Sequence, residues 1–372
     1  MIGGKGKGGL SPISAFVLGA ASATIFLVFI FSNQHTRQPL EISSFKTKRQ
    51  FTAPSDHANF ENKVNNTSSI QAVNKRTSKK QPWPHANQTS DDQHLQDMLR
   101  KAALDDNTII MTSVNEAWAA PNSLLDSFFE SFRVGENMER FLKHIFVVAL
   151  DAKAYQSCKS LHPYCYFLKQ EGLDLSGEQS YMKNVYLDLV WSKLKLQQRI
   201  LELGYNLLFT DVDIAWLRDP FEYITLAPHI STSSDFYFGN PDDLGNYPNT
   251  GFIYFKSCKK NIKVMDYWHK SRKRFPENHD QFVFNEIKHE IVKKFGVRMK
   301  FLDTAHISGF CQLGRDLSKI ATVHMTCCIG LENKLFDLKR ILEDWRSYLA
   351  HPQWERQLDK IKWRFEGGRC IH

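Results

Sequence analysis

Cysteine is absent from the first 157 residues of the chain. All seven cysteines lie further on, at Cys158, Cys165, Cys258, Cys311, Cys327, Cys328 and Cys370. No C-x-x-C pair with a matching second half occurs among them, which argues against a structural zinc site. This usage suits an oxidising compartment, with up to three disulfide bridges and one thiol left over, and the pairing stays open.

Net charge is also scarce over most of the chain. The formal charge is +8, from 48 Lys+Arg and 40 Asp+Glu, and residues 1–104 hold 13 of the basic and 6 of the acidic residues. That leaves 35 basic and 34 acidic residues for 105–372, the part that we expect to fold. A dedicated nucleic-acid-binding domain would carry a clear positive excess there, so we expect no nucleic-acid partner.

One segment lacks charge altogether. Ser11–Ser32 is uncharged and mostly apolar, and about 20 such residues span a bilayer as a helix. A cleaved signal peptide is the alternative, but its apolar region is shorter and ends at small residues, whereas this one ends on "FLVFIFS". We therefore expect a cytosolic tail (1–11) and an uncleaved membrane anchor (12–31), with flanking charges that give no clear orientation.

The next segment, 32–104, lacks a sustained apolar period and is rich in Asn, Gln, Ser, Thr and Lys. We expect an extended or disordered stem. Glycosylation sequons at Asn65, Asn66 and Asn87 cluster in it, which favours a luminal stem.

From residue 105 onward, short apolar runs alternate with helical patterns. "NTIIMTSV", "HIFVVALD", "CYFL" and "NLLFTD" are typical of strands, and a long amphipathic helix is expected over Tyr181–Leu203, closed by Gly204. This alternation predicts one α/β domain over 105–372 with a mixed, mostly parallel sheet. Ligands in such domains bind beyond the carboxyl ends of the strands.

Asp211 and Asp213 fall at such a strand end, in "NLLFTDVDIAWLRDP". In an extended chain they point to the same side, where two carboxylates repel unless a cation or a buried proton separates them. Oxygen ligands in small number suit Mg²⁺ or Mn²⁺ shared with substrate phosphates. The alternative is a strand end with solvated acids, and that interpretation fits Asp219 in the Asp-Pro turn.

A longer series of segments resembles the plant nucleotide-diphospho-sugar transferase family, which includes cell-wall xylosyl- and arabinofuranosyl-transferases. The segments are "RILELGYNLLFTDVDIAWLRDPF", "NTGFIYFKS", "HDQFVFNEI", "FLDTAHISGFC" and "VHMTCCIGLENK", and they occur in the family's order. The resemblance implies a GT-A type fold, a nucleotide-sugar donor, Mn²⁺ or a similar ion, retention of configuration and a Golgi type II membrane topology. Ser308-Gly309 departs from it, because the family usually has two glycines there.

The resemblance also assigns roles to single residues. Asp211 and Asp213 resemble the metal-binding pair, and His324 resembles a third ligand, which imidazole supplies well to Mn²⁺. Asp280 and Gln281 resemble a pair near the transferred sugar, where they could stabilise positive charge at the anomeric carbon. The alternatives are an ordinary histidine at a strand end and a polar helix start with Asp280 as N-cap.

Five further residues are candidates for substrate binding. Asn249, Thr250 and Gly251 could approach sugar hydroxyls, or they could form a turn before the strand "FIYF". Lys334 and Lys193 could neutralise diphosphate oxygens, although a solvated surface position is the commoner situation for Lys193. We expect Trp191, Trp216 and Trp268 to be core residues.

We therefore expect a metal-dependent glycosyltransferase in the Golgi membrane with a luminal catalytic domain, acting on a glycan or glycoprotein in cell-wall or glycoprotein biosynthesis. Two alternatives use the same features. One is a metal-dependent hydrolase of phosphodiesters or nucleotide sugars, although two-metal hydrolases generally need more ligands. The other is a non-catalytic luminal glycan-binding protein on a transferase fold.

Overall fold

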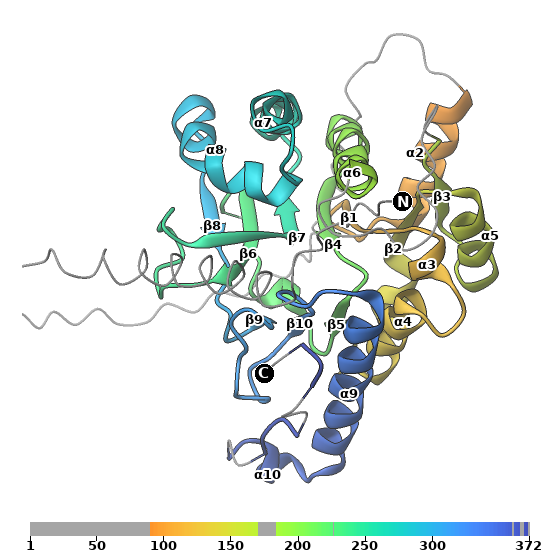
Figure 1. Cartoon of the computed structure of the whole chain (residues 1–372), viewed down its shortest axis with the longest axis vertical. Helices are drawn as coiled ribbons and strands as arrows, with labels where there is room; N and C mark the ends of the chain where they lie inside the picture. The colour runs from red at the N-terminus through yellow and green to blue at the C-terminus, as the bar shows by residue number, and fades with distance from the viewer. Residues whose placement is uncertain (1–89, 170–183, 226, 359–360, 365–367, 371–372) are drawn as a thin grey trace, which may run out of the picture. The chain divides into compact units, whose positions relative to one another are not determined.

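The computed structural model describes residues 90–169, 184–225, 227–358, 361–364 and 368–370 (Figure 1). The strands are β1 (Thr108–Val114), β2 (Ile145–Ala149), β3 (Cys165–Phe167), β4 (Asn206–Thr210), β5 (Ile214–Trp216), β6 (Ile230–Phe236), β7 (Tyr247–Phe255), β8 (Met299–Phe301), β9 (Ile307–Gly309) and β10 (Thr322–His324). The α-helices are α2 (Ser90–Ala102), α3 (Glu116–Ala119), α4 (Leu124–Val134), α5 (Ala152–Leu161), α6 (Asn184–Glu202), α7 (Lys259–Ser271), α8 (Asp280–Phe295), α9 (Leu331–Ala350) and α10 (Gln353–Arg356). Short 3-10 helices cover Glu139–His144, Pro220–Glu222 and Arg272–Arg274.

The main sheet has seven strands in the order β3-β2-β1-β4-β7-β6-β8. Strands β3, β2, β1 and β4 pair in parallel, β7 runs antiparallel to both β4 and β6, and β8 is parallel to β6. The predicted α/β architecture with a mixed, mostly parallel sheet is therefore confirmed.

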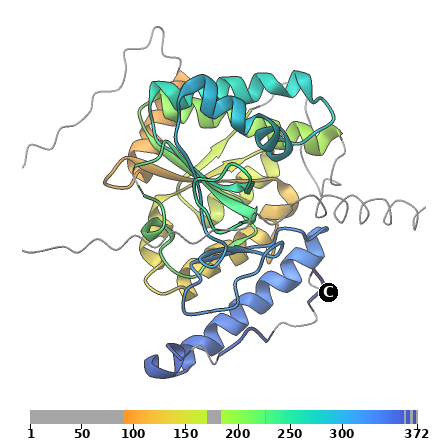
Figure 2. The ribbon, with the colours of Figure 1, turned by 90° about the vertical axis from the view of Figure 1, so that its left-hand side faces the viewer.

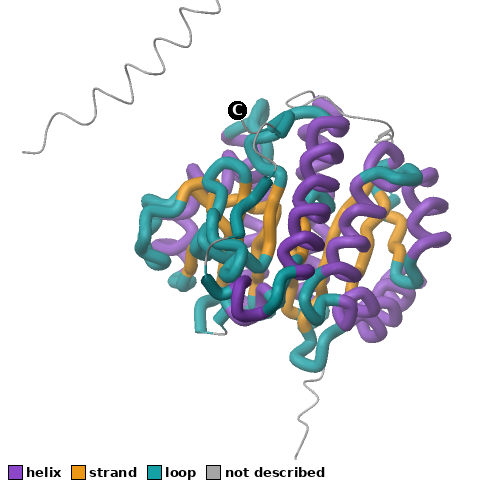
Figure 3. Tube along the Cα trace, turned by 90° about the horizontal axis from the view of Figure 1, so that it is seen from below, coloured by secondary structure: helices purple, strands orange, loops and turns teal. Residues whose placement is uncertain are grey.

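Two hydrophobic clusters cover the two faces of this sheet. In β1, Ile109 and Met111 belong to the cluster with α2, α6, α7 and α8, while Ile110 belongs to the cluster with α4, α9 and the second sheet. Helices therefore cover both faces, as Figures 2 and 3 show. Burial on both sides explains why the strands read as continuous apolar runs instead of alternating ones.

The second sheet has three short strands in the order β5-β10-β9. β10 pairs antiparallel with β5, so that His324 lies opposite Ile214, and parallel with β9, so that His324 lies opposite Gly309. Since β5 begins directly after Asp213, this pairing brings a histidine from the C-terminal part of the chain to the end of β4.

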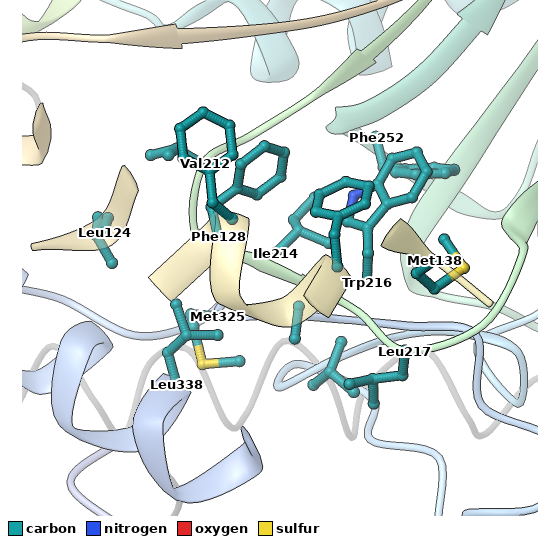
Figure 4. Close-up of a cluster of buried hydrophobic side chains, with 14 of the residues drawn as sticks. Leu124, Phe128, Met138, Val212, Ile214, Trp216, Leu217, Phe252, Met325 and Leu338 are labelled. Carbon is teal, nitrogen blue, oxygen red and sulfur yellow. The ribbon is translucent and has the colours of Figure 1, made fainter. Parts of the chain in front are cut away.

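Buried apolar residues lie next to Asp211, Asp213 and His324 in the sequence. Val212 lies between the two acids, Ile214 follows the second acid and Met325 follows the histidine, and their exposed fractions are 3%, 0% and 0%. Figure 4 shows Val212 beside Phe128 and Ile214 beside Trp216, with Met325 close to Leu338 of α9. The polar side chains between them are therefore held on a backbone fixed by core packing.

The N-terminal boundary of the folded part differs from the expectation. The extended stem was expected to reach residue 104, but residues 90–102 form α2. Leu95, Leu99 and Ala102 are buried there against the sheet. Polar residues on the opposite side of the helix obscure this apolar stripe in the sequence. The rest of the predicted stem with its sequons, the predicted cytosolic tail and the predicted membrane anchor lie outside the described residues. None of the described helices has the length and apolar content of a membrane span.

The seven cysteines form three disulfides, Cys158–Cys165, Cys311–Cys327 and Cys328–Cys370, and leave Cys258 as a thiol. The expectation of up to three bridges and one unpaired cysteine is confirmed, and the adjacent Cys327 and Cys328 are bridged to different partners. Two of the bonds start within four residues of His324 and fasten the segment that follows β10.

Candidate metal and nucleotide-sugar site

Asp211, Asp213 and His324 come together at the carboxyl end of β4. Each offers one ligand atom, and these atoms lie within 4.8 Å of one another. His324 Nε2 is 3.1 Å from Asp213 Oδ1 and 3.7 Å from Asp211 Oδ2. The backbone supports this arrangement, because Met325 N donates to Asp213 O at 3.2 Å and Asp211 N donates to the carbonyl of Gly251 at 2.7 Å.

The residues present fit a divalent cation. Two carboxylates and one imidazole form a donor set that suits Mn²⁺ or Mg²⁺ and leaves further positions open for phosphate oxygens. Gly251 is required for this geometry, because a Cβ at that position would overlap both Asp211 Oδ2 and the His324 ring. His324 Nδ1 is buried and has no hydrogen-bond partner among the described residues, and the ring lines a small hollow together with Asn249 and Thr326.

The charges of the three groups depend on one another. Although burial acts in the opposite direction, Lys334 and His324 hold the pKa of Asp213 well below its usual range. Burial raises the pKa of Asp211, and Asp213 adds to this effect while Lys193 opposes it. Burial alone would lower the pKa of His324, but the two carboxylates outweigh it and raise the pKa. The site therefore holds a firmly ionised acid beside a second acid that binds its proton more readily.

Both candidate lysines lie at this site. Lys334 Nζ, from the first turn of α9, donates to Asp213 Oδ2 at 2.5 Å. Lys193 Nζ, from α6, lies 3.9 Å from Asp211 Oδ1 and 3.5 Å from Asp280 Oδ2, and 4.3 Å above the centroid of the Phe209 ring. Lys193 is only 6% exposed, so the solvated surface position suggested by its residue type is wrong. A buried ammonium among carboxylates is a paired charge, which explains why its pKa is raised despite the opposing effect of burial.

Asp280 and Gln281 begin α8 beside these groups. Asp280 is the first helical residue and not the N-cap, because His279 Nδ1 accepts from Phe282 N in that role. Asp280 is 4% exposed, and its Oδ2 faces Lys193 and makes no hydrogen bond within the described part of the chain. Trp268 Nε1 donates to the Asp280 carbonyl at 2.9 Å, which fixes the start of the helix.

Asn249, Thr250 and Gly251 lie inside β7, so the alternative of a turn before the strand is wrong. Asn249 Oδ1 accepts from Gly251 N at 2.9 Å, and Gln281 Oε1 accepts from Thr250 N at 3.1 Å. Asn249 and Gln281 both donate to one further carboxylate, that of Asp235, at 2.8 and 2.6 Å. The candidate residues of β7 and α8 therefore form one hydrogen-bonded group next to the metal cluster.

Asp235 is the residue of this site that sequence reasoning missed. It lies near the end of β6, at a register shift between Ser234 and Phe236 where the β6–β7 ladder is interrupted. Such irregularities redirect side chains near active sites. Burial raises the pKa of Asp235, although Asn249 and Gln281 both donate to it. A strand ending in an acid, as in "STSSD", was the one available signal.

The other side chains considered in the sequence analysis stabilise the fold and do not line the site. Trp191, Trp216 and Trp268 are each no more than 1% exposed, which confirms the expectation of core residues. Asp219 accepts from Phe221 N and pairs with Arg140. It therefore caps a short helix, as expected of an acid in an Asp-Pro turn.

Comparisons with known proteins identify the family of the chain. The model of the nucleotide-diphospho-sugar transferase family matches residues 140–338. An uncharacterized Arabidopsis thaliana protein is 38% identical over 255 residues, which are 68% of this chain and 67% of the relative. The Arabidopsis thaliana UDP-D-xylose:L-fucose alpha-1,3-D-xylosyltransferase 3 is 24% identical over 194 residues, 46% of this chain and 49% of the relative.

Among solved structures, a glycosyltransferase involved in glycosylation of the major capsid of PBCV-1 matches with a TM-score of 0.36 and 12% identity. The match covers 62% of this chain and 98% of that chain. The family match includes Asp211, Asp213, Asp235, Gln281 and His324 within its bounds. The chain therefore belongs to the nucleotide-diphospho-sugar transferase family.

Proposed function

We propose that the protein is a metal-dependent glycosyltransferase of the GT-A type that moves a sugar from a nucleotide diphosphate donor to a glycan or glycoprotein acceptor. The observation that carries the proposal is the meeting of Asp211, Asp213 and His324, from two distant segments, around the space that Gly251 leaves open. Family membership supports the nucleotide-sugar donor. The two alternatives, a hydrolase and a non-catalytic glycan-binding protein, would use the same residues. A measurement of turnover therefore distinguishes them from a transferase.

Asp211, Asp213 and His324 would hold Mn²⁺ or Mg²⁺, which supplies a Lewis acid for a diphosphate leaving group. Lys334 lies beside this cluster and keeps 29% of its side chain exposed. Its ammonium can therefore contact both Asp213 and an oxygen of a bound diphosphate. Lys193 is enclosed, so its role is to neutralise Asp211 and Asp280.

Asp280 and Gln281 are the groups proposed to stand near the transferred sugar. The amide of Gln281 is fixed by Thr250 and Asp235. The carboxylate of Asp280 is buried, with one oxygen that receives no hydrogen bond from any residue that the structure describes. A preoriented carboxylate and amide can stabilise positive charge that develops at the anomeric carbon. Retention of configuration at that carbon is part of the proposal and follows from the family resemblance.

A location in the Golgi membrane is also proposed, with a single N-terminal anchor and a luminal catalytic domain. The uncharged stretch Ser11–Ser32 supports an anchor. The three disulfides suit a lumen, because such bonds persist in oxidising compartments. A role in cell-wall polysaccharide or glycoprotein biosynthesis is the corresponding biological proposal.

The test uses the full-length protein in detergent with a panel of nucleotide sugars, Mn²⁺ and mixed glycan acceptors. We expect transfer of one sugar, loss of transfer with a chelator, and recovery on adding Mn²⁺. Asp213→Asn should reduce turnover by about 10²-fold or more, because it removes a charged ligand of the ion. Asp219→Asn is the matched control, since asparagine still caps its short helix.

Three results would contradict the proposal. Transfer that survives chelation would remove the ion from the reaction. Release of nucleotide diphosphate or sugar without transfer to any acceptor would favour the hydrolase. Glycan binding without turnover would favour the non-catalytic alternative.

A further inference from the structure

The hairpin between β6 and β7, whose backbone is drawn in Figure 1, carries three exposed aromatic rings. Phe236, Phe238 and Tyr247 are 43%, 63% and 51% exposed. Tyr247 packs edge-on against both phenylalanines, with centroid distances of 6.1 and 6.2 Å. Clustered exposed aromatic side chains mark binding surfaces, because their apolar area gains free energy only when something covers it. We call these three residues the aromatic platform.

A fixed loop holds the platform. Asn246 is fully buried, and its amide donates to the carbonyls of Asn240 and Asp243 at 2.7 and 2.8 Å while its Oδ1 accepts from Phe238 N at 2.7 Å. Lys288 of α8 is 6% exposed and donates to the Asn246 carbonyl at 2.7 Å. The rings are therefore displayed on a loop ordered by internal hydrogen bonds, which reduces the entropy lost when a ligand binds.

The platform is continuous with the candidate site. Phe236 directly follows Asp235, and it is the cross-strand partner of Tyr247. Asp235 in turn binds Asn249 and Gln281 of the site. Of the six large aromatic side chains exposed by more than a third in the described part of the chain, three lie on this one hairpin.

The chemistry of the loop indicates what covers the rings. The face of an aromatic ring is negative, so it attracts the polarised C–H groups on the apolar face of a sugar ring. Residues 236–247 also contain Asp242 and Asp243, both exposed, and no lysine or arginine. Carboxylates accept hydrogen bonds from sugar hydroxyls but repel uronic acids and anionic lipids. The loop therefore suits a neutral saccharide.

We infer that the aromatic platform is the acceptor-binding surface of the enzyme and that it takes a neutral glycan. This inference rests on the proposed function, because it identifies the acceptor side of the same site. The metal cluster and its lysines serve the donor, while Phe236, Phe238 and Tyr247 stack against acceptor sugar rings. Asp235 lies between the two halves.

Binding of full-length protein to an immobilised array of neutral and uronic-acid oligosaccharides tests the inference. We expect the wild-type protein to bind neutral oligosaccharides, and Phe238→Ala and Tyr247→Ala each to weaken that binding about tenfold or more. Tyr247→Phe keeps the ring and should stay within about twofold of wild type. Trp354→Ala is the matched control, because Trp354 is 63% exposed like Phe238 but lies on α10, beyond the far end of α9.

A second readout separates this inference from the proposed function. Mn²⁺-dependent binding of the nucleotide-sugar donor, measured without any glycan, should be the same in wild type and in Phe238→Ala. If wild-type protein turns over the donor but binds no neutral oligosaccharide, or if the alanine variants bind as well as wild type, the acceptor surface is elsewhere. A wild-type dimer that the alanine variants convert to monomers, with glycan binding intact, would identify the platform as a contact between two copies. If no donor is turned over while the array results hold, the proposed function fails and glycan binding remains.

Discussion

Gly251→Ala tests the metal site with a change of one methyl group. The new Cβ would overlap Asp211 Oδ2 and the His324 ring and would lie 2.9 Å from Asn249 Oδ1. For ordinary contact in this close-packed region, the carboxylate and the ring must each move by about 1 Å. Metal–ligand distances tolerate only about 0.2 Å. We therefore expect Mn²⁺ affinity to fall by about 10²-fold or more, because two of the three ligands are displaced together.

Gly251→Ala should change the free energy of unfolding less than it changes the free energy of Mn²⁺ binding. Overpacking a core position costs about 1–3 kcal/mol, and replacing glycine by alanine in a strand offsets about 0.5–1 kcal/mol of this through the unfolded state. The net loss is about 1–2 kcal/mol, which leaves a folded protein to measure.

Mn²⁺ binding by isothermal titration calorimetry, together with the thermal unfolding midpoint, is the assay. Gly245→Ala is the control, because its methyl group would meet only the carboxylate of Asp243, at 3.1 Å. Mn²⁺ affinity of Gly251→Ala within about twofold of wild type, with the protein folded, would refute the assignment of Asp211 and His324 as ligands of one ion.

Three further predictions concern two residues near the site and one buried tyrosine of β7. Lys193→Met should lower the free energy of unfolding, measured in urea, by about 3 kcal/mol, because it leaves the Asp280 carboxylate buried without its cation. Lys195 is exposed and lies two residues along the same helix, so Lys195→Met should change the free energy of unfolding little. Cys327→Ser should weaken Mn²⁺ binding about tenfold by loosening the segment that follows His324. Burial raises the pKa of Tyr254 to about 12, so its contribution to stability is complete below pH 10 and is lost as the pH rises through about 12. The free energy of unfolding of wild type should therefore fall more steeply above pH 10 than that of Tyr254→Phe.

Each of these predictions has a result that would contradict it. Equal urea midpoints for the two lysine variants would place Lys193 outside the buried ion-pair group. Cys158→Ser removes a disulfide at β3, away from the site, and a loss of Mn²⁺ affinity equal to that of Cys327→Ser would indicate a general loss of stability. Parallel pH profiles for wild type and Tyr254→Phe would show that the hydroxyl ionises as it does in the unfolded chain.

The parts of the site that depend on local pattern could be predicted from the sequence. A buried apolar run that ends in two acids separated by one residue specifies both the strand β4 and the shared direction of Asp211 and Asp213. His324 was found through the family resemblance, because its approach depends on the pairing of β10 with β5, which no local pattern contains. The spacing of residues along the sequence does not indicate that these two strands pair.

Two residues show what local pattern leaves out. Lys193 lies on a helix whose neighbouring residues carry both apolar and charged side chains, and only the position of α8 and β4 decides that its ammonium is enclosed. Asp235 is directed into the site by an irregularity in the β6–β7 ladder, and a register shift depends on two strands together. The helix α2 was missed for the same reason. Its short apolar stripe identifies it as part of the folded domain only when the sheet that it covers is known.

The pairing of β5 with β10 has a consequence for how the protein is made. Asp213 and His324 are separated by more than one hundred residues, so the loop between them must close before both contact one ion. During synthesis, the first half of the domain leaves the ribosome with two acids and no third ligand. The complete ion site exists only after the small sheet has formed, and contacts of such sequence separation form slowly. If the three residues hold an ion, as proposed, that ion would stabilise finished molecules and not partly folded ones, and metal binding would be a late step in maturation.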